Sequence, residues 1–370
     1  MKKVLIIQAG FFPAKNYGGP PVSIKNLCLA LDGLFDFYIV TQNKELHEKE
    51  PLLANNNIWH YMWNINVKYL NAKDFFPYKF NKIVSEIRPS TLYLQSFFSF
   101  KIVLPTILYA KKNKVKLIIA PRGELLSGAL KKKWKKIPYI YFMKLILPKN
   151  TLFQGTSAEE IKSLKFFFPK WDNIFLKNLP SPIDLQSSYH KKKNNTTKFI
   201  FLSRIVKKKN LKFALDILKD ISENIIFDIY GPIEDLNYWK QCSELIASMP
   251  ENISINYCGV VSNEDVTKVF NQYDFFLFPT YSENYGHVIV EAMVSNCPVI
   301  ISDNTPWNDI NIVKSGFALP LSEKELFVNV INKAIKMDQQ EYNKLIMNNR
   351  RFVREFVYDD VSVEMYRELF

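Results

Sequence analysis

The sequence is poor in the residues that build metal sites, disulfide bonds and flexible loops. Among 370 residues it has only four cysteines, four histidines and eleven glycines. Cys28, Cys242, Cys258 and Cys297 lack the paired spacing of a zinc or redox motif, so we expect free thiols in a reducing cytosol and no metal site. No uninterrupted run of roughly 18 apolar residues occurs, so no segment is predicted to span a membrane.

Positive charge is in excess. The chain has 49 Lys and Arg against 36 Asp and Glu, a net charge of +13, which favours an anionic partner: nucleic acid, a lipid surface or a phosphate-bearing substrate. Charge alone does not choose among these. With 48% hydrophobic and 23% charged residues the chain is typical of a globular protein, and its length predicts two domains.

Short apolar segments rich in Val, Ile and Phe alternate with helical stretches in both halves of the sequence, which is typical of parallel sheets covered by helices on both faces. In residues 23–34, apolar side chains fall at helical spacing and predict a helix. The predicted strands are residues 3–9, 35–41, 91–96, 115–121 and 151–157 in the first half, and 198–204, 225–231, 253–259, 274–280 and 297–302 in the second.

Residues 178–198 separate the two series and contain two prolines, a lysine run and polar residues, a composition typical of a linker. We place the domain boundary near residue 185; the alternative is a surface loop inside one large domain. Most glycines follow predicted strands, where an open parallel sheet has its ligand crevice. These glycines are Gly10, Gly18, Gly19, Gly123, Gly155, Gly231, Gly259, Gly286 and Gly316.

The segment PTYSENYGHVIVEAMVSNCPVI, residues 279–300, carries two acids eight positions apart, Glu283 and Glu291. We expect Glu283 to precede a helix and Glu291 to lie more than one turn inside it. The helix start offers unpaired N–H groups to an anion, and Gly286 lets a ligand approach the backbone. Two such acids suit two sets of hydroxyls separated by a diphosphate, as in a sugar nucleotide; the alternative is a helix-start acid and a solvated helix charge.

SENYGHVIVEAM resembles the E-x7-E signature of the retaining glycosyltransferases of family 4. FLSRIVKKKNL resembles the family's G-R-…-K-G element, whose Arg and Lys bind the donor diphosphate; this implies Arg204 and Lys209, with Lys208 as the competing lysine. The catalytic residues implied are Glu283, Arg204 and Lys209, with Glu283 positioning the donor hexose. Ser203, Asn210 and Asn296 stand where the family has glycine, and asparagine tolerates left-handed backbone geometry.

NYGGPPVSIKNL resembles the family's N-terminal glycine loop, and IAPRGELLSGALKKKWKK, GTSAEEI and NLPSPID resemble further stretches of its first domain and linker. The likeness covers nearly the whole chain and is strongest between residues 197 and 302. It implies the GT-B fold: an α/β architecture of two Rossmann-like domains with parallel sheets facing across a cleft. The domains expected are residues 1–185 on the acceptor side, residues 186–355 for the donor, and a C-terminal helix, 356–370, crossing back to the first domain.

The resemblance also implies the donor-binding residues and the cofactor requirement. No D-x-D occurs, which agrees with a metal-independent enzyme without cofactor. The chemistry needs cations and a helix start to stabilise the negative charge that develops on the departing nucleoside diphosphate. The donor-binding residues implied are Gly18, Gly19, Ser203, Arg204, Lys209, Asn284, Tyr285, Gly286, His287 and Glu291.

The first domain departs from the family pattern at the strand 91–96. Many relatives carry a histidine after this strand, near the reacting sugar, whereas Gln95 or Ser96 takes its place here. Arg122 and Glu124 follow a neighbouring strand and face the same cleft. They either contact the acceptor or the donor hexose, or form a structural salt bridge.

Residues 128–149, GALKKKWKKIPYIYFMKLILPK, join a cluster of lysines around Trp134 to an apolar continuation. This composition suits the surface of an anionic bilayer, and the alternative is a helix packed on the core with a solvated basic end. Similar enzymes often have acceptors that are lipid-linked or part of a lipopolysaccharide. We therefore expect a bacterial protein in the cytoplasm, peripheral on the inner face of the cell membrane.

The sequence thus predicts a retaining hexosyltransferase acting on a polysaccharide or lipid-linked glycan, of the lipopolysaccharide, O-antigen or capsule type. A nucleotide-sugar epimerase of related fold is the enzymatic alternative, although histidine for acid/base work is scarce. A basic nucleic-acid-binding protein is the alternative from another class. Its recognition motifs are absent from the sequence and the lysine clusters are short, so we expect no nucleic-acid partner.

Overall fold

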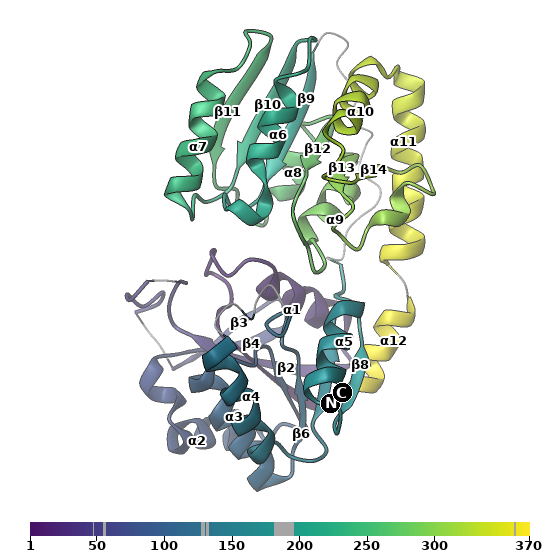
Figure 1. Ribbon diagram of the computed structural model, residues 1–370. Helices are drawn as coiled ribbons and strands as arrows, with labels where there is room; N and C mark the ends of the chain where they lie inside the picture. Colours follow the sequence, from purple (N-terminus) through teal and green to yellow (C-terminus); the bar gives the residue numbers. More distant parts are fainter. Residues whose placement is uncertain (47, 55–56, 127–129, 131–132, 181–195, 359) are drawn as a thin grey trace. The chain divides into compact units, whose positions relative to one another are not determined.

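The computed structural model describes residues 1–370 except 47, 55–56, 127–129, 131–132, 181–195 and 359, so most of the predicted linker lies outside the described residues. The chain divides into two compact units, unit 1 (Met1–Pro182 with Asp360–Phe370) and unit 2 (Ile183–Asp359). Each unit is a sheet with helices on its faces (Figure 1). The prediction of two α/β domains with parallel sheets is therefore confirmed.

The sheet of unit 1 has the strand order β3-β4-β2-β1-β5-β6-β7-β8. All neighbouring strands pair in parallel except β3 and β4, which are antiparallel at one edge. The strands are β1 (Lys2–Gln8), β2 (Phe35–Gln42), β3 (Trp59–Met62), β4 (Ile65–Leu70), β5 (Thr91–Leu94), β6 (Lys116–Ile119), β7 (Leu152–Gly155) and β8 (Asp172–Phe175).

Helices cover both faces of this sheet. On one face, Ile6 and Ile39 pack with Leu27 of α1 and Leu369 of α12; on the other, Leu94 packs with residues of α2 to α5. The C-terminal helix therefore contributes to the core of unit 1. The helices are α1 (Gly19–Ala30), η1 (Ala72–Phe75), α2 (Pro77–Ile87), α3 (Phe100–Asn113), α4 (Lys133–Ile146), α5 (Ala158–Phe167) and α12 (Asp360–Leu369).

The helix predicted over 23–34 is shifted. α1 begins at Gly19 and ends at Ala30, because Pro20 and Pro21 occupy its first turn, where proline's fixed φ suits the helix and its missing N–H leaves no bond unmade. The chain then turns through Gly33, whose φ is 77°. The apolar periodicity therefore predicts a helix here, but it does not reveal that the two prolines lie in its first turn.

Unit 2 has a parallel sheet of order β11-β10-β9-β12-β13-β14 built on one continuous core. Its strands are β9 (Thr197–Leu202), β10 (Ile225–Tyr230), β11 (Ile253–Gly259), β12 (Phe275–Phe278), β13 (Val299–Ser302) and β14 (Phe317–Leu319). Its helices are η2 (Lys207–Lys209), α6 (Leu211–Leu218), α7 (Leu236–Ala247), α8 (Val266–Phe270), α9 (His287–Val294), η3 (Asn308–Ile310), α10 (Lys324–Lys336), α11 (Gln339–Phe352) and the π-helical turn η4 (Val353–Val357).

Each sheet reverses its strand order at one point. In unit 1 the order turns back between β1 and β5, and in unit 2 between β9 and β12. The connections on either side of such a switch point leave in opposite directions and open a crevice at the carboxyl ends of the strands. The topology therefore predicts one ligand site at the ends of β1 and β5 and another at the ends of β9 and β12.

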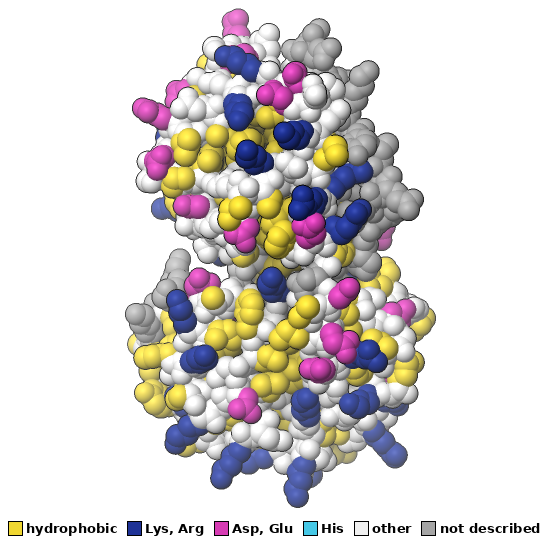
Figure 2. Space-filling view, turned by 90° about the vertical axis from the view of Figure 1, so that its right-hand side faces the viewer, with side chains coloured by type: hydrophobic (Ala, Val, Ile, Leu, Met, Phe, Trp, Pro, Cys, Tyr) yellow, Lys and Arg dark blue, Asp and Glu magenta, His cyan; other side chains and the backbone are white. Residues whose placement is uncertain are grey.

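The surface carries its positive charge in a dispersed way. On the face drawn in Figure 2, lysine and arginine side chains lie among acidic and apolar ones over both units. No helix within the described ranges is long and apolar enough to cross a membrane.

Candidate active site

The loop after β9 is held in place by the loops on either side of it. Ser203 N donates to Tyr230 O at 3.0 Å, and Ile205 N donates to Pro232 O at 2.8 Å. Gly231 is needed for this approach, because a Cβ there would lie 1.9 Å from Ser203 O. The backbone that carries Arg204 is therefore fixed against the end of β10.

The turn η2 then presents its lysines. Asn210 ends it with left-handed geometry, φ 60° and ψ 37°, and Asn296 also has a positive φ of 54°. The prediction that these asparagines preserve glycine-like turns is confirmed. Asn210 Nδ2 donates to Pro279 O at 2.9 Å, which ties the loop after β9 to the loop after β12.

Lys209 and Glu283 form an ion pair across the switch point of unit 2. Their side chains are only 12% and 11% exposed. Burial lowers the pKa of Lys209; the charge of Glu283 opposes this effect, while Arg204 and Lys208 add to it. Lys208 is exposed and binds the β12 loop through its backbone, since Lys208 O accepts from Tyr281 N at 3.0 Å. Of the two competing lysines, the structure brings Lys209 to the acid.

Arg204 lies close enough to add positive potential at Lys209, and its own side chain pairs with Glu234. Arg204 Nη1 lies 3.0 Å from Glu234 Oε2, and the arginine side chain is 37% exposed. Glu234 is not among the site residues predicted from the sequence. The available signal was its position just after the predicted strand 225–231, since the ends of neighbouring parallel strands meet at one edge.

The start of α9 completes this edge. Gly286 has φ 77° at the N-cap, and a Cβ there would lie 2.9 Å from Ile289 Cδ1, so the position favours glycine on both counts. Glu283 and Asn284 precede the helix, His287 is its first residue, and Glu291 lies in its second turn. Glu283 therefore precedes the helix and Glu291 lies more than one turn inside it, as predicted.

Tyr285 is a buried support for this loop. Its ring packs against Trp307 at 5.1 Å and His287 at 4.7 Å between centroids, and Trp307 Nε1 donates to Tyr285 O. Tyr285 thus holds the helix start in place from the core side, a role that its predicted contact with the donor did not include.

The switch point of unit 1 carries a row of buried polar side chains. Gln8 on β1 pairs in register with Thr41 on β2, and Gln95 follows at the same level on β5, so the three side chains share one face. Both amide atoms of Gln8, Thr41 Oγ1 and Gln95 Nε2 are buried without a hydrogen-bond partner among the described residues. Gly18, with φ 70°, and Gly19 begin α1, which covers this face. Gln8 and Thr41 were not predicted, although they end predicted strands.

Arg122 and Glu124 serve separate structural networks, so the salt bridge considered between them is wrong. Arg122 Nε donates to Gln95 Oε1 at 2.7 Å, Nη1 donates to Asn178 Oδ1, and Nη2 lies 3.3 Å from the Tyr93 hydroxyl. The guanidinium therefore orients Gln95 and joins β5 to the start of the linker.

Glu124 holds the loop after β5. Its carboxylate accepts from Phe97 N at 2.6 Å, Phe98 N at 3.0 Å and Ser96 Oγ at 2.9 Å. Burial raises the pKa of Glu124, and these hydrogen bonds oppose the rise. Ser96 and Glu124 thus build the loop, whereas Gln95 keeps a donor, Nε2, that has no partner among the described residues.

Residues 183–352 match the family model described as glycosyl transferases group 1. The capsular polysaccharide biosynthesis glycosyltransferase CapH of Staphylococcus aureus is 24% identical over 338 residues, covering 88% of this chain and 89% of that protein. An uncharacterized glycosyltransferase of Methanocaldococcus jannaschii, MJ1178, is also 24% identical and covers 99% of each chain.

Solved structures agree over the full length. HepE of Anabaena, in complex with UDP and glucose, superimposes with a TM-score of 0.72 at 14% identity and covers 100% of this chain and 99% of its own. The sucrose-phosphate synthase of Thermosynechococcus elongatus gives 0.73 at 13% identity with the same coverage. The fold is GT-B. The family match and the curated relatives support a glycosyltransferase of the group 1 superfamily, with homologues in capsule and polysaccharide synthesis.

Proposed function

We propose that the chain is a retaining glycosyltransferase of family 4 that transfers a hexose from a nucleotide-diphosphate sugar to a polysaccharide or lipid-linked glycan. The observation that carries the proposal is the Lys209–Glu283 ion pair beside Arg204, at the switch point of unit 2. Two cations and a helix start at one sheet edge suit a diphosphate, and the acid among them suits sugar hydroxyls.

Each cation exchanges its present partner for phosphate when the donor binds. Arg204 leaves Glu234, and Lys209 moves from Glu283 to a phosphate oxygen, which frees the Glu283 carboxylate to accept hydrogen bonds from the hexose. As the anomeric C–O bond breaks, negative charge grows on the diphosphate, and Arg204, Lys209 and the N-terminus of α9 stabilise it without a metal. The departing phosphate takes the acceptor's proton on the same face of the sugar, so the anomeric configuration is retained.

The nucleotide is placed by the residues behind this edge. Glu291, in the second turn of α9, is our candidate for the ribose hydroxyls, and Gly286 allows the diphosphate to reach the backbone N–H groups. HepE, which shares the fold, was solved with UDP and with UDP-glucose, so UDP-hexoses are the first donors to test.

The acceptor side is assigned to the polar row of unit 1. Gln8, Thr41 and Gln95 carry donors and acceptors that have no protein partner within the described part of the chain. Leaving such groups buried and unpaired costs about 1–3 kcal/mol each, and hydroxyl groups of a sugar would satisfy them after small side-chain rotations. We assign them to the acceptor or to the donor hexose.

We further propose that α4 docks on an anionic membrane. Ile140, Met143 and Leu147 face the core, while Trp134, Tyr141 and Leu145 are 74%, 63% and 79% exposed. One face of the helix therefore packs on the core. A second apolar face is exposed, and the lysines around it are exposed or half-buried. Residues 128, 129, 131 and 132 of the predicted membrane segment lie outside the described residues.

A hydrolysis screen tests the reaction. Purified protein is incubated with UDP-, GDP-, ADP- and dTDP-hexoses without acceptor, and release of nucleoside diphosphate is measured. We expect slow hydrolysis of one donor, lost in Lys209→Ala and kept in Lys240→Ala, an exposed lysine on α7. A protein that folds normally but releases no diphosphate from any donor, with or without added glycan, contradicts the proposal.

A further inference from the structure

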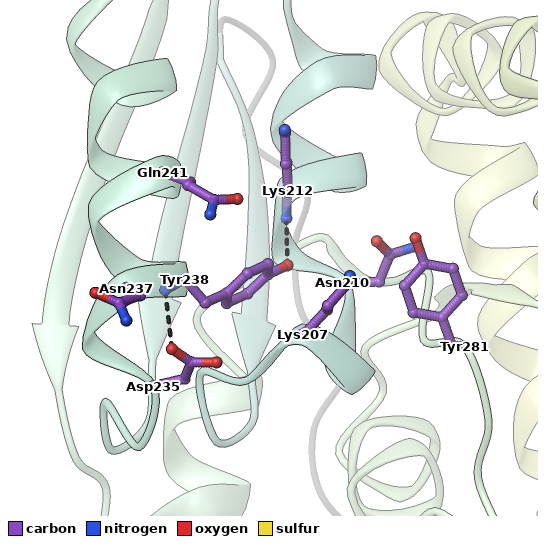
Figure 3. A pocket seen from close by; sticks show the side chains of 8 residues that line it. All are labelled: Lys207, Asn210, Lys212, Asp235, Asn237, Tyr238, Gln241 and Tyr281. Atoms are coloured by element: carbon purple, nitrogen blue, oxygen red, sulfur yellow. Dashed lines mark hydrogen bonds between the residues drawn. The ribbon is translucent and has the colours of Figure 1, made fainter. Parts of the chain in front are cut away.

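A cavity of about 330 Å³ opens in unit 2 beside the η2 turn. Its walls come from four places: Lys207 on η2, Lys212 at the start of α6, Asn237 and Gln241 on α7, and Tyr281 on the loop after β12 (Figure 3). Lys209, on the same turn, faces Glu283 and does not line it. Residues of one turn therefore contribute to both the cavity and the candidate donor site.

The lining favours a hydroxylated anion. Lys207 and Lys212 are exposed, and neither ammonium has an ion-pair partner among the described residues. The one acid in the wall, Asp235, is committed to α7, since its Oδ1 accepts from Tyr238 N at 3.0 Å. Two amide side chains add donors and acceptors for hydroxyls, and a volume of this size accommodates a small ligand such as one or two sugar rings.

Hydrogen bonds connect the wall of the cavity to the η2 turn and to Glu283. Tyr281, which is 51% exposed and offers its ring to the cavity, donates its N–H to Lys208 O at 3.0 Å. The hydroxyl of Thr280, the residue before it, lies 3.2 Å from Lys208 O and 3.4 Å from Glu283 Oε1, so its single proton can be donated to either acceptor. The wall of the cavity is therefore connected through residues 280–283 and the η2 turn to the Lys209–Glu283 pair.

We propose that this cavity binds an acidic sugar unit of the acceptor glycan, with Lys207 and Lys212 facing its carboxylate or phosphate and Tyr281 packing on its ring. The assignment rests on the proposed function, because only an acceptor chain longer than the reacting sugar would extend from the transfer site into the cavity. Its consequence is a preference for charged over neutral glycans.

Direct binding tests the cavity independently of transfer. The full chain is titrated with a tetrasaccharide of alternating glucuronic acid and N-acetylglucosamine, with the neutral tetramer of N-acetylglucosamine, with glucose 6-phosphate and with inorganic phosphate. We expect the glucuronic acid chain or the sugar phosphate to bind better than the neutral chain. The double variant Lys207→Ala and Lys212→Ala should bind it roughly fivefold to tenfold more weakly, as loss of two solvated charge contacts predicts.

Three controls separate the outcomes. Lys240→Ala removes an α7 lysine that does not line the cavity and should leave glycan binding unchanged. The double variant Lys207→Arg and Lys212→Arg keeps both charges and should bind the glycan as wild type does. UDP affinity should not change in the double Ala variant, which shows that the donor site is intact. Equal binding by wild type and double variant, binding of free phosphate alone, or no binding of any probe overturns the proposal. Lysine-dependent glycan binding without donor hydrolysis would instead refute the transferase function; the cavity would then be a glycan-binding site but not an acceptor site.

Discussion

Lys209 and Glu283, which are 74 positions apart in the sequence, meet in a largely buried ion pair. Each follows one of the two strands that flank the switch point of unit 2, β9 and β12. The pair therefore lies at the edge of the sheet where the topology predicts a ligand site. Because each partner is also a proposed ligand of the donor, the pair describes the site before the donor binds.

The pair should be strongly coupled in stability. Removing one partner leaves the other buried without its counter-charge, so we expect Lys209→Met and Glu283→Gln each to lower the free energy of unfolding by roughly 2–4 kcal/mol. The double variant should lose less than the sum, because no unpaired charge remains. Urea unfolding of the four proteins measures this coupling; additive losses would show that the two groups do not interact in solution.

The two acids should affect different steps. Glu283→Ala should lower the transfer rate about 100-fold or more while largely sparing UDP binding, since its proposed contacts are with the hexose. Glu291→Ala should instead weaken donor binding roughly tenfold or more, because a charge-assisted hydrogen bond to the ribose is lost. Steady-state kinetics and calorimetric titration with UDP separate these effects, and unchanged kinetics in both variants would refute the assignment.

The pH dependence of UDP binding should report on Lys209. Its pKa is lowered chiefly by burial, and the neighbouring Glu283 limits that decrease. In Glu283→Gln this opposition disappears and the pKa falls further, so the ammonium is lost, and UDP binding declines, at a lower pH than in wild type. Titrations from neutral to alkaline pH measure the shift. Lys209→Arg, whose guanidinium stays charged, should bind UDP without this decline; a parallel decline there would assign the titration to another group.

Much of the fold could be predicted, because local sequence patterns specify most of the strands. Buried parallel strands are continuous apolar runs, so all ten predicted strands are present. The turns at Asn210 and Asn296 were predicted from the family's glycines at these positions and from asparagine's tolerance of left-handed geometry, and both residues have the expected positive φ. β3, β4, β8 and β14 were missed because they are short or carry polar residues, such as Asn66 and Lys68 in β4, that break the apolar pattern.

The remainder of the site depends on which strands become neighbours. Arg122 and Glu124 are two positions apart and were considered as a pair, yet they bind Gln95 and the 96–98 loop separately. Glu234 reaches Arg204 only because β10 lies beside β9. The polar row arises from the order β2-β1-β5, which no local pattern specifies. The residues at the site could therefore be predicted from the sequence, whereas the side chains and strands that they contact could not.

We expect the buried side-chain amide of Gln8 to lower the free energy of unfolding. Its side chain is 2% exposed and neither amide atom has a hydrogen-bond partner among the described residues. Gln8→Met, which keeps the length and removes the polar atoms, should therefore raise the free energy of unfolding by roughly 1–2 kcal/mol. Gln154→Met is the matched control on β7. Its Nε2 donates to Leu176 O at 3.1 Å and to the Tyr366 hydroxyl at 2.7 Å, so this change should destabilise.

Destabilisation by Gln8→Met would show that the amide is already satisfied, for instance by buried water, and would remove the reason for assigning it to a substrate. If stability rises as expected, transfer to an acceptor should fall in the same variant while donor hydrolysis continues.

The exposed face of α4 should determine membrane binding. The triple variant Trp134→Ser, Tyr141→Ser and Leu145→Ser removes three large apolar side chains that are more than half exposed and leaves the buried Ile140 and Met143 in place, so folding should be retained. In flotation with vesicles, wild type should bind anionic lipid and release it as salt rises, and the variant should bind roughly 100-fold more weakly. Ile312→Ser replaces an equally exposed apolar residue of unit 2, at 77%, controls for non-specific hydrophobic binding and should bind as wild type does.

Equal partitioning of wild type into anionic and neutral vesicles would contradict the electrostatic part of the proposal. Unchanged binding of the triple variant would move the docking surface away from α4.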